Sequence, residues 1–249
     1  MDLQLKEKKA LIFGSSAGIG YAIAESMVNE KAHIFLNSRN ADRLAESVKK
    51  LSPKGVVGSV VADLTKAGEA KMATQEALAK MQGLDILVMN TGGPAKGAFS
   101  DISNEQWHLD FQNLWMSFVE AVKVVLPTMK KQQYGRIILI TSLAAKEPLP
   151  NLTTSNGLRA GLAGLCKSLA SEVAADGITV NLLLPGYTDT DRLKELNLSQ
   201  EKIKQMIPAG RLGNPKELGD LACFLASPLA GYITGQSIAV DGGVLKGIG

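Results

Sequence analysis

The chain contains few cysteine and histidine residues, the side chains that build disulfide frameworks and most transition-metal sites. Its two cysteines, Cys166 and Cys223, both lie in apolar stretches with helical spacing. They indicate buried thiols in a reducing compartment, not a disulfide bridge. Its two histidines, His33 in an expected strand and His108 in an expected helix, have no partner at ligand spacing, so the sequence predicts no metal site.

Charge of one sign and long apolar runs are also lacking. The formal net charge of +3 is small and evenly spread over 249 residues, which argues against nucleic acid or a membrane surface as a partner. No apolar run is long enough to span a bilayer, and no apolar signal segment precedes the first expected strand. We therefore expect a cytoplasmic protein.

The composition that remains, with 45% hydrophobic and 20% charged residues, is ordinary for a globular protein. Short apolar runs alternate with longer runs of helical periodicity. The expected strands are Lys9–Phe13, His33–Asn37, Val56–Val61, Ile86–Asn90, Arg136–Thr141, Thr179–Leu184 and Ser237–Val240. The expected helices are Ala22–Asn29, Asp42–Leu51, Ala67–Met81, Asn104–Lys131 and Ser155–Ala175. This alternation predicts an α/β fold, a Rossmann-type doubly wound parallel sheet of about seven strands with helices on both faces. No repeat or linker interrupts it, so residues 1–249 are expected to form a single domain.

A glycine-rich segment, Gly14–Gly20, connects the first expected strand to the first expected helix. Glycine allows a tight turn and a close backbone approach to a pyrophosphate, and the helix N-terminus then presents free N–H groups. Because the strand and the helix are both in place, we interpret the segment as a dinucleotide-binding loop and not as a plain turn. Its predicted cofactor-binding residues are Gly14, Ser15, Ser16, Gly18, Ile19 and Gly20.

The second expected strand leads into Ser38 and Arg39, at the place where an acidic residue would bind the ribose hydroxyls of NAD. An acid there would repel a 2′-phosphate, whereas Arg39 offers a guanidinium that can bind phosphate through two hydrogen bonds. The sequence therefore favours NADP as the cofactor. NAD is the alternative cofactor, and a solvated loop charge is the alternative role of Arg39.

The expected helix Asn104–Lys131 carries two further signals. Asn113 has poor helix propensity in the middle of this helix, which favours a functional reason for it over an exposed surface position. Four aromatic residues recur at helical spacing and predict one packed face. They are Trp107, Phe111, Trp115 and Phe118.

Further motifs carry a resemblance to a known family. Ser142 ends an apolar run, Ser155 follows thirteen positions later, and Arg159 follows four positions after that. Asn90-Thr91-Gly92 ends the fourth expected strand, and Pro185-Gly186 opens a segment that contains Thr188 and Thr190. With the Gly-x-x-x-Gly-x-Gly spacing of the glycine loop, this pattern resembles the short-chain dehydrogenase/reductase family over nearly the whole chain.

The resemblance implies an NAD(P)-dependent oxidoreductase that acts on a small carbonyl or alcohol substrate. The combination around Ser155 is similar to a subgroup often named 3-oxoacyl-carrier-protein reductase. The resemblance also implies a homo-oligomer, a tetramer or a dimer, and a substrate lid near residues 187–212, for which a surface excursion is the alternative. It implies cofactor contacts at Asp63, Leu64, Asn90, Thr91, Gly92, Arg159, Pro185, Gly186, Thr188 and Thr190. From the residues alone, Asp63 is equally suited to cap the next helix.

The family reduces carbonyl groups with a Ser, Tyr, Lys and Asn set, in which the Tyr is the general acid. The resemblance assigns Ser142 and Asn113 to this catalytic set, with Ser155 in the place of the Tyr and Arg159 in the place of the Lys. A serine hydroxyl is a far poorer acid than a phenol, and a guanidinium stays protonated. Ser155 is as well suited to cap the following helix.

If hydride transfer occurs, another group or a water must therefore supply the proton. Lys146 and Tyr187 are the candidate side chains. The retained Ser142 and the glycine loop favour an oxidoreductase. The missing phenol motivates two alternatives: a dinucleotide-binding protein without turnover, as a sensor or assembly partner, and a lyase or isomerase that uses the same pocket.

Overall fold

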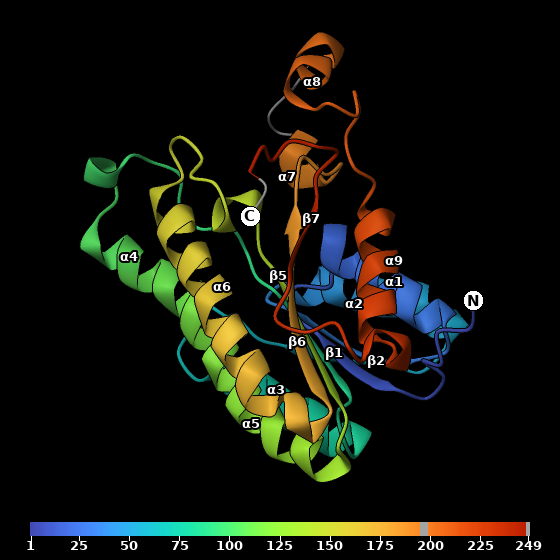
Figure 1. The fold of residues 1–249 in the computed structure, drawn as a ribbon. Helices are drawn as coiled ribbons and strands as arrows, with labels where there is room; N and C mark the ends of the chain where they lie inside the picture. The colour runs from blue at the N-terminus through green and yellow to red at the C-terminus, as the bar shows by residue number, and fades with distance from the viewer. Residues whose placement is uncertain (195–198, 248–249) are drawn as a thin grey trace.

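A computed structural model describes residues 1–194 and 199–247 (Figure 1). Within these residues seven parallel strands form one sheet in the order β3-β2-β1-β4-β5-β6-β7. The strands are β1 Lys9–Ile12, β2 His33–Ser38, β3 Val57–Val61, β4 Ile86–Asn90, β5 Gly135–Ile140, β6 Ile178–Pro185 and β7 Ser237–Val240. Each strand end lies within one residue of its expected position, because apolar runs bounded by polar residues mark strands that are covered on both faces.

The helices lie in two layers, one on each face of the sheet (Figure 1). One layer contains α3 Glu69–Met81, α4 Asn104–Phe111, α5 Ser117–Gln132 and α6 Thr153–Val173. The other contains α1 Gly18–Asn29, α2 Ala41–Leu51 and α9 Pro215–Ala226. Two short helices, α7 Asp191–Lys194 and α8 Gln200–Met206, lie beyond the carboxyl ends of the strands. The doubly wound single-domain fold predicted from the sequence is confirmed.

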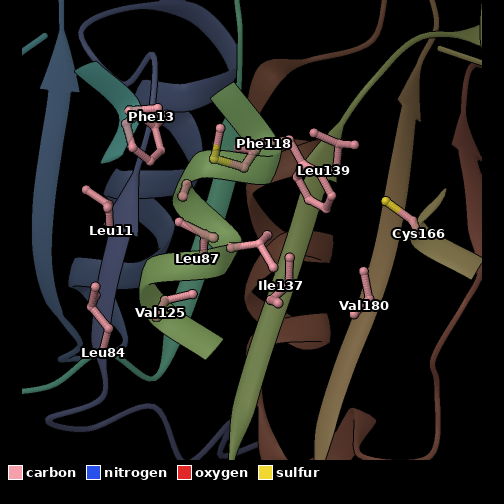
Figure 2. Packing of buried hydrophobic residues seen from close by; sticks show 14 of the residues in the cluster. Leu11, Phe13, Leu84, Leu87, Phe118, Val125, Ile137, Leu139, Cys166 and Val180 are labelled. Atoms are coloured by element: carbon pink, nitrogen blue, oxygen red, sulfur yellow. The ribbon is translucent and has the colours of Figure 1, made fainter. Parts of the chain in front are cut away.

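A separate hydrophobic core lies under each helix layer. Figure 2 shows part of the first, in which Phe118 of α5 lies beside Leu139 of β5, and Val125 of α5 lies near Leu87 and Ile137. Cys166 of α6 belongs to this core, whereas Cys223 of α9 belongs to the core on the opposite face. The sheet therefore separates the two thiols, and both are free and buried, as the sequence predicted.

Local side chains fix several helix starts. The side chain of Asn40 accepts a hydrogen bond from the Arg43 N–H at the start of α2, and Ser103 accepts one from Gln106 at the start of α4. Asn214 and Glu217 form a reciprocal capping box at α9. These contacts satisfy backbone donors that the first helical turn leaves without partners.

The single helix expected over Asn104–Lys131 is interrupted. A π-helical segment, Gln112–Met116, joins α4 to α5, and the Ser117 N–H bonds to the carbonyl of Gln112. The prediction of one packed aromatic face was wrong, since Phe118 is buried but Phe111 is 39% exposed and stacks on Trp115. The wider turn rotates the following residues relative to α4, so positions at regular spacing no longer share one face.

The sheet order places β1 between β2 and β4, so the direction of winding reverses between β1 and β4. In doubly wound sheets, ligands bind in the crevice outside the carboxyl ends of the strands at this reversal. The loops after β1, β4 and β5 all open at this edge.

Candidate functional site

A cavity of about 860 Å³ opens at the carboxyl edge of the sheet. It brings together most of the predicted site residues from every part of the chain. The predicted residues on its wall are Gly14, Ser16, Ile19, Ser38, Arg39, Asp63, Leu64, Asn90, Thr91, Gly92, Asn113, Ser142, Ser155, Arg159, Pro185, Gly186 and Thr190. The sequence-distant motifs therefore form one site.

Two glycines of the loop are packed so closely that neither position has room for a side chain. Gly14 has φ +57°, and a Cβ built on it would lie 2.2 Å from the carbonyl oxygen of Asn90. A Cβ on Gly20 would lie 2.2 Å from the carbonyl oxygen of Gly14. The Asn90 side-chain amide donates to that same oxygen at 2.9 Å. Asn90 thus ties the end of β4 to the turn after β1.

Not every residue of the loop faces the cavity. The Ser15 side chain is fully buried, donates to the Ile12 carbonyl at 2.7 Å and accepts the Asn37 N–H at 3.0 Å. Ser15 therefore fastens β1 to β2 and does not line the cavity, and cofactor binding by this residue stays a prediction. Gly18 and Gly20 also lie off the wall, although Gly18 lies next to Thr190, whose Cγ2 would be 3.3 Å from a Cβ on Gly18.

The first turn of α1 is open to an anion. Ala17 at its N-cap gives no side-chain hydrogen bond, and no acidic residue lies in the first turn. Ser16 and Ser38, whose hydroxyls are 2.9 Å apart, line the cavity beside Arg39. Free N–H groups, hydroxyls and a guanidinium are the donors that phosphate oxygens require, so this end of the cavity fits a dinucleotide phosphate.

Asp63 lines the cavity, but it does not cap the next helix. Helix α3 begins at Glu69, with Gly68 as its N-cap. The carboxylate of Asp63 instead accepts the backbone N–H and hydroxyl of Thr65. Burial opposes ionisation, but these hydrogen bonds and the positive charges of Arg39 and Lys66 together lower the pKa of Asp63. It is an anion positioned to accept hydrogen bonds.

The second group of side chains lies at the ends of β5 and α6. The Ser142 hydroxyl oxygen accepts the N–H of Ala144 at 3.2 Å, which caps the short turn Leu143–Ala145. Ser155 and Arg159 are both buried and lie one helical turn apart on α6. Helix α6 begins at Thr153 with Leu152 as its N-cap, so the interpretation of Ser155 as the N-cap was wrong. Its side chain faces the cavity instead.

Asn113 lies inside the π-helical segment. Its side chain is buried and donates to the Gly92 carbonyl at 3.3 Å, in the loop after β4. π-Helical segments within helices frequently occur at functional sites. The poor helix propensity of Asn113 is thus matched by an irregular backbone at the cavity wall.

Three further predicted contributors lie away from the cavity wall. Thr188 is buried, and its hydroxyl donates to the carbonyl of Gly186. Tyr187 lies in a separate pocket of about 70 Å³ with Arg211 and Asp241. Lys146 follows the Leu143–Ala145 turn and does not line the cavity, so the structure brings neither candidate proton source to it. The lid expected near 187–212 falls partly on residues 195–198, which lie outside the described residues.

The cavity wall also contains residues that the sequence patterns missed. Three of them come from α4, and they are Gln106, Leu109 and Asp110. No motif marks these three, because their position depends on how α4 and α6 pack around the loop. The wall residues Pro94, Ala95 and Leu152 lie in the segments Pro94–Phe99 and Leu143–Leu152, which the sequence predicted to form the pocket walls.

The described residues offer neither a metal centre nor a membrane-spanning helix. They contain no group of three or more His, Cys, Asp or Glu side chains placed to hold a metal ion. None of the described helices combines the length and apolar character needed to cross a bilayer.

The chain is similar in sequence and in structure to known reductases. A family profile described as enoyl-(acyl carrier protein) reductase matches residues 14–245. The chain is 33% identical over 260 residues to the NADPH-dependent reductase BacG of Bacillus subtilis (strain 168), covering 98% of this chain and 100% of BacG. L-sorbose reductase from Gluconobacter frateurii, solved with NADPH and L-sorbose, matches with a TM-score of 0.94 and 32% identity over 100% of both chains.

A further solved structure is also similar to this chain. It is an NADPH-bound short chain oxidoreductase from Pseudomonas aeruginosa PAO1, described as containing an atypical catalytic center. It matches with a TM-score of 0.90 and 29% identity, covering 98% of each chain. The present chain belongs to the short-chain dehydrogenase/reductase family, as its motifs predicted.

Proposed function

We propose that this protein is an NADP-dependent oxidoreductase that transfers hydride between the nicotinamide and a carbonyl or alcohol substrate. The observation that carries the proposal is the single cavity that joins the glycine loop and Arg39 to Ser142. By their descriptions, BacG is NADPH-dependent and L-sorbose reductase was solved with NADPH bound, and this chain is similar to both. When bound, NADPH supplies the hydride.

We assign cofactor binding to the wall residues of the glycine loop and of the strand ends. Arg39 and Ser38 would hold the 2′-phosphate, since no acidic residue stands at the tip of β2 to repel it. The N–H groups at the start of α1 would hold the pyrophosphate. Asp63 would accept a hydrogen bond from the adenine, and Thr190 would lie at the carboxamide end.

Ser142 is the group that would orient a substrate carbonyl. Its oxygen accepts the Ala144 N–H, which holds the side chain in place and leaves the hydroxyl proton able to point at an acceptor in the cavity. Asn113, whose side chain donates to the Gly92 carbonyl in the loop after β4, would complete the polar part of the cavity wall.

Arg159 and Ser155 act differently from a Lys and Tyr pair. The guanidinium of Arg159 stays protonated, so it stabilises negative charge on the substrate oxygen but moves no proton. The Ser155 hydroxyl can donate a hydrogen bond, yet it is badly matched to general-acid catalysis near neutral pH. Since neither Lys146 nor Tyr187 lines the cavity, we assign the proton to bulk solvent, relayed through a water held by the hydroxyls of Ser142 and Ser155, so that no hydroxide is left in the site.

The proposal also covers the substrate class, the cellular compartment and the oligomeric state. The substrate is a small carbonyl or alcohol compound, and a 3-oxoacyl thioester remains one candidate. Two free, buried thiols support a reducing compartment, and hence the cytoplasm. Exposed apolar side chains on α4, Leu109 and Phe111, support a homo-oligomer, a tetramer or a dimer.

The test is a fluorescence titration of the purified protein with NADPH and NADH, followed by a screen for ketone-dependent NADPH oxidation. We expect tighter binding of NADPH than of NADH, and turnover that Ser142→Ala reduces by at least about a hundredfold, as in other sites that lose one donor to a developing oxyanion. The variant should bind NADPH with unchanged affinity. Full turnover by Ser142→Ala would show that this residue does not orient the substrate.

A second candidate function rests on Ser155 and Arg159, which replace the phenol and amine of the family. It is a dinucleotide-binding protein without turnover. It predicts NADPH binding equal to that of an active relative, with no NADPH oxidation by any ketone in the screen. The same two measurements therefore separate the candidates.

A further inference from the structure

One wall of the cavity carries a buried acidic side chain that no family motif explains. This wall is made by α4 and by the loop after β4, and its members are Pro94, Ala95, Gln106, Leu109 and Asp110. Leu109 is 43% exposed, whereas Asp110 is only 3% exposed. The carboxylate is thus enclosed between α4 and the loop while it still borders the cavity.

The hydrogen bonds of Asp110 leave part of its capacity unused. Oδ1 accepts the Gln106 side-chain amide at 2.8 Å, and the Ala95 N–H lies 3.1 Å from Oδ2 and 3.4 Å from Oδ1. An ionised carboxylate offers about four acceptor positions. Both of its donors are neutral, and within the described part of the chain they are the polar contacts that the carboxylate makes. A buried charge is costly unless further donors compensate it.

The contact with the loop does not itself require a negative charge. Asp110 holds the Ala95 N–H, and the Ala95 carbonyl accepts the Thr154 hydroxyl at 3.3 Å, so the loop is fixed between α4 and α6. An asparagine oxygen could accept the same N–H. Asp101 performs the same task for the Ala98 N–H in a neighbouring turn, but Asp101 is exposed and lies off the cavity wall.

Asp110 borders the same cavity as the residues proposed to bind the substrate. It precedes Asn113 by three residues, across the junction between α4 and the π-helical segment. Both residues line the cavity. A substrate whose carbonyl contacts Ser142 can therefore place another polar group against Asp110 in the same cavity.

We propose that Asp110 determines substrate specificity by accepting a hydrogen bond from a hydroxyl or ammonium group of the carbonyl substrate, and that its charge excludes substrates with a carboxylate or phosphate at that end. The inference rests on the proposed function, because it concerns the substrate half of the same cavity. A hydrogen bond to a charged acceptor corresponds to roughly a ten- to hundredfold difference in affinity.

The test uses four ketones of one shape: cyclohexanone with a methyl, hydroxyl, amino or carboxyl group at position 4. Affinity is measured by calorimetry on the protein saturated with NADP⁺, which cannot reduce a ketone. NADP⁺ could oxidise the alcohol of the hydroxy ketone, so the absence of NADPH formation is checked for that compound, and NADPH oxidation is measured separately. The wild-type protein is expected to bind the hydroxy or the amino ketone roughly ten- to a hundredfold more tightly than the methyl ketone, and the carboxy ketone most weakly. Comparison of the hydroxy ketone with the amino ketone shows whether Asp110 accepts its hydrogen bond from a hydroxyl or from an ammonium group.

The variants are Asp110→Asn and, as the matched control, Asp101→Asn. Asp110→Asn should lose the preference for the amino ketone and the exclusion of the carboxy ketone, with unchanged NADPH affinity, while Asp101→Asn should behave as wild type. Equal binding of all four ketones by wild type, no measurable binding of any, or an unchanged preference in Asp110→Asn would overturn the inference. If the binding preference appears but no ketone oxidises NADPH, the proposed function fails and the inference stands. If a ketone oxidises NADPH but the protein shows no binding preference, the proposed function stands and the inference fails.

Discussion

The closest packing in the cofactor loop gives the sharpest stability prediction, for Gly20→Ala. An alanine normally stabilises a helix relative to glycine, by about 1 kcal/mol. Here its Cβ would lie 2.2 Å from the Gly14 carbonyl oxygen and 2.7 Å from the Asn90 side-chain nitrogen, well inside the 3.4 Å at which ordinary contact begins. The Gly14 carbonyl would have to move by about 1 Å, which would break its hydrogen bond from Asn90.

The expected net effect is a loss of about 1–3 kcal/mol, the usual cost of overpacking. For a chain of this size the melting temperature should fall by about 2–4 °C for each kcal/mol. NADPH affinity should fall at least about tenfold, because the displaced carbonyl lies on the cavity wall. Thermal unfolding followed by circular dichroism and a fluorescence titration measure the two effects.

Gly164→Ala provides the matched control. Gly164 is also helical, but a Cβ on it would meet no atom within 4 Å. This variant should be more stable than wild type by about 0.5–1 kcal/mol and should bind NADPH normally. The reasoning is refuted if both alanine variants change stability in the same direction, or if Gly20→Ala binds NADPH as well as wild type.

Three further predictions concern charge and protonation. Arg39→Ser should weaken NADPH binding by roughly ten- to a hundredfold and leave NADH binding unchanged, as titration with each cofactor would show; an equal loss for both would remove Arg39 from the 2′-phosphate site. Burial raises the pKa of Tyr134 to about 12 from the ordinary value of 10.0, and its hydroxyl donates to the Ala226 carbonyl. The folded state favours the neutral phenol of Tyr134. The stability that this preference contributes is therefore complete below about pH 10 and is lost as the pH rises through about 12. Tyr134→Phe should be less stable by about 1 kcal/mol at neutral pH, and urea unfolding should show the difference shrinking above pH 10. Burial also raises the pKa of Cys166 to about 12, and it raises the pKa of Cys223. An aromatic disulfide reagent should therefore label neither thiol until the protein is unfolded. Rapid labelling of the native protein would contradict the burial of the two thiols.

Much of the fold could be predicted because its signals are local. Strands buried on both faces are apolar throughout, and this pattern placed each strand end within one residue. The glycine loop could be interpreted because a strand, a glycine pattern and a helix follow one another directly. The short helices α7 and α8 were missed, since brief charged segments carry no clear periodicity.

The candidate site was predictable only in part. Ser15 and Ser16 are neighbours with the same side chain, yet Ser15 fastens two strands while Ser16 faces the cavity. The π-helical turn around Asn113 left no sign that separates it from a regular helix with an unfavourable residue. Ser155 suits an N-cap by residue type, but the helix begins two residues earlier.

The sequence by itself determined the sheet, the order of its elements and the chemistry of the cofactor loop, because hydrophobic periodicity and glycine spacing act over a few residues. It also showed that Ser155 and Arg159 replace the family's Tyr and Lys. Only the tertiary structure decided which polar groups border the cavity. Asp110 and Asp101 both hold a loop N–H, but one is enclosed at the cavity wall and the other is exposed to solvent. The physical reason is that the direction and burial of a side chain are set by the elements packed around it, and these come from distant parts of the chain.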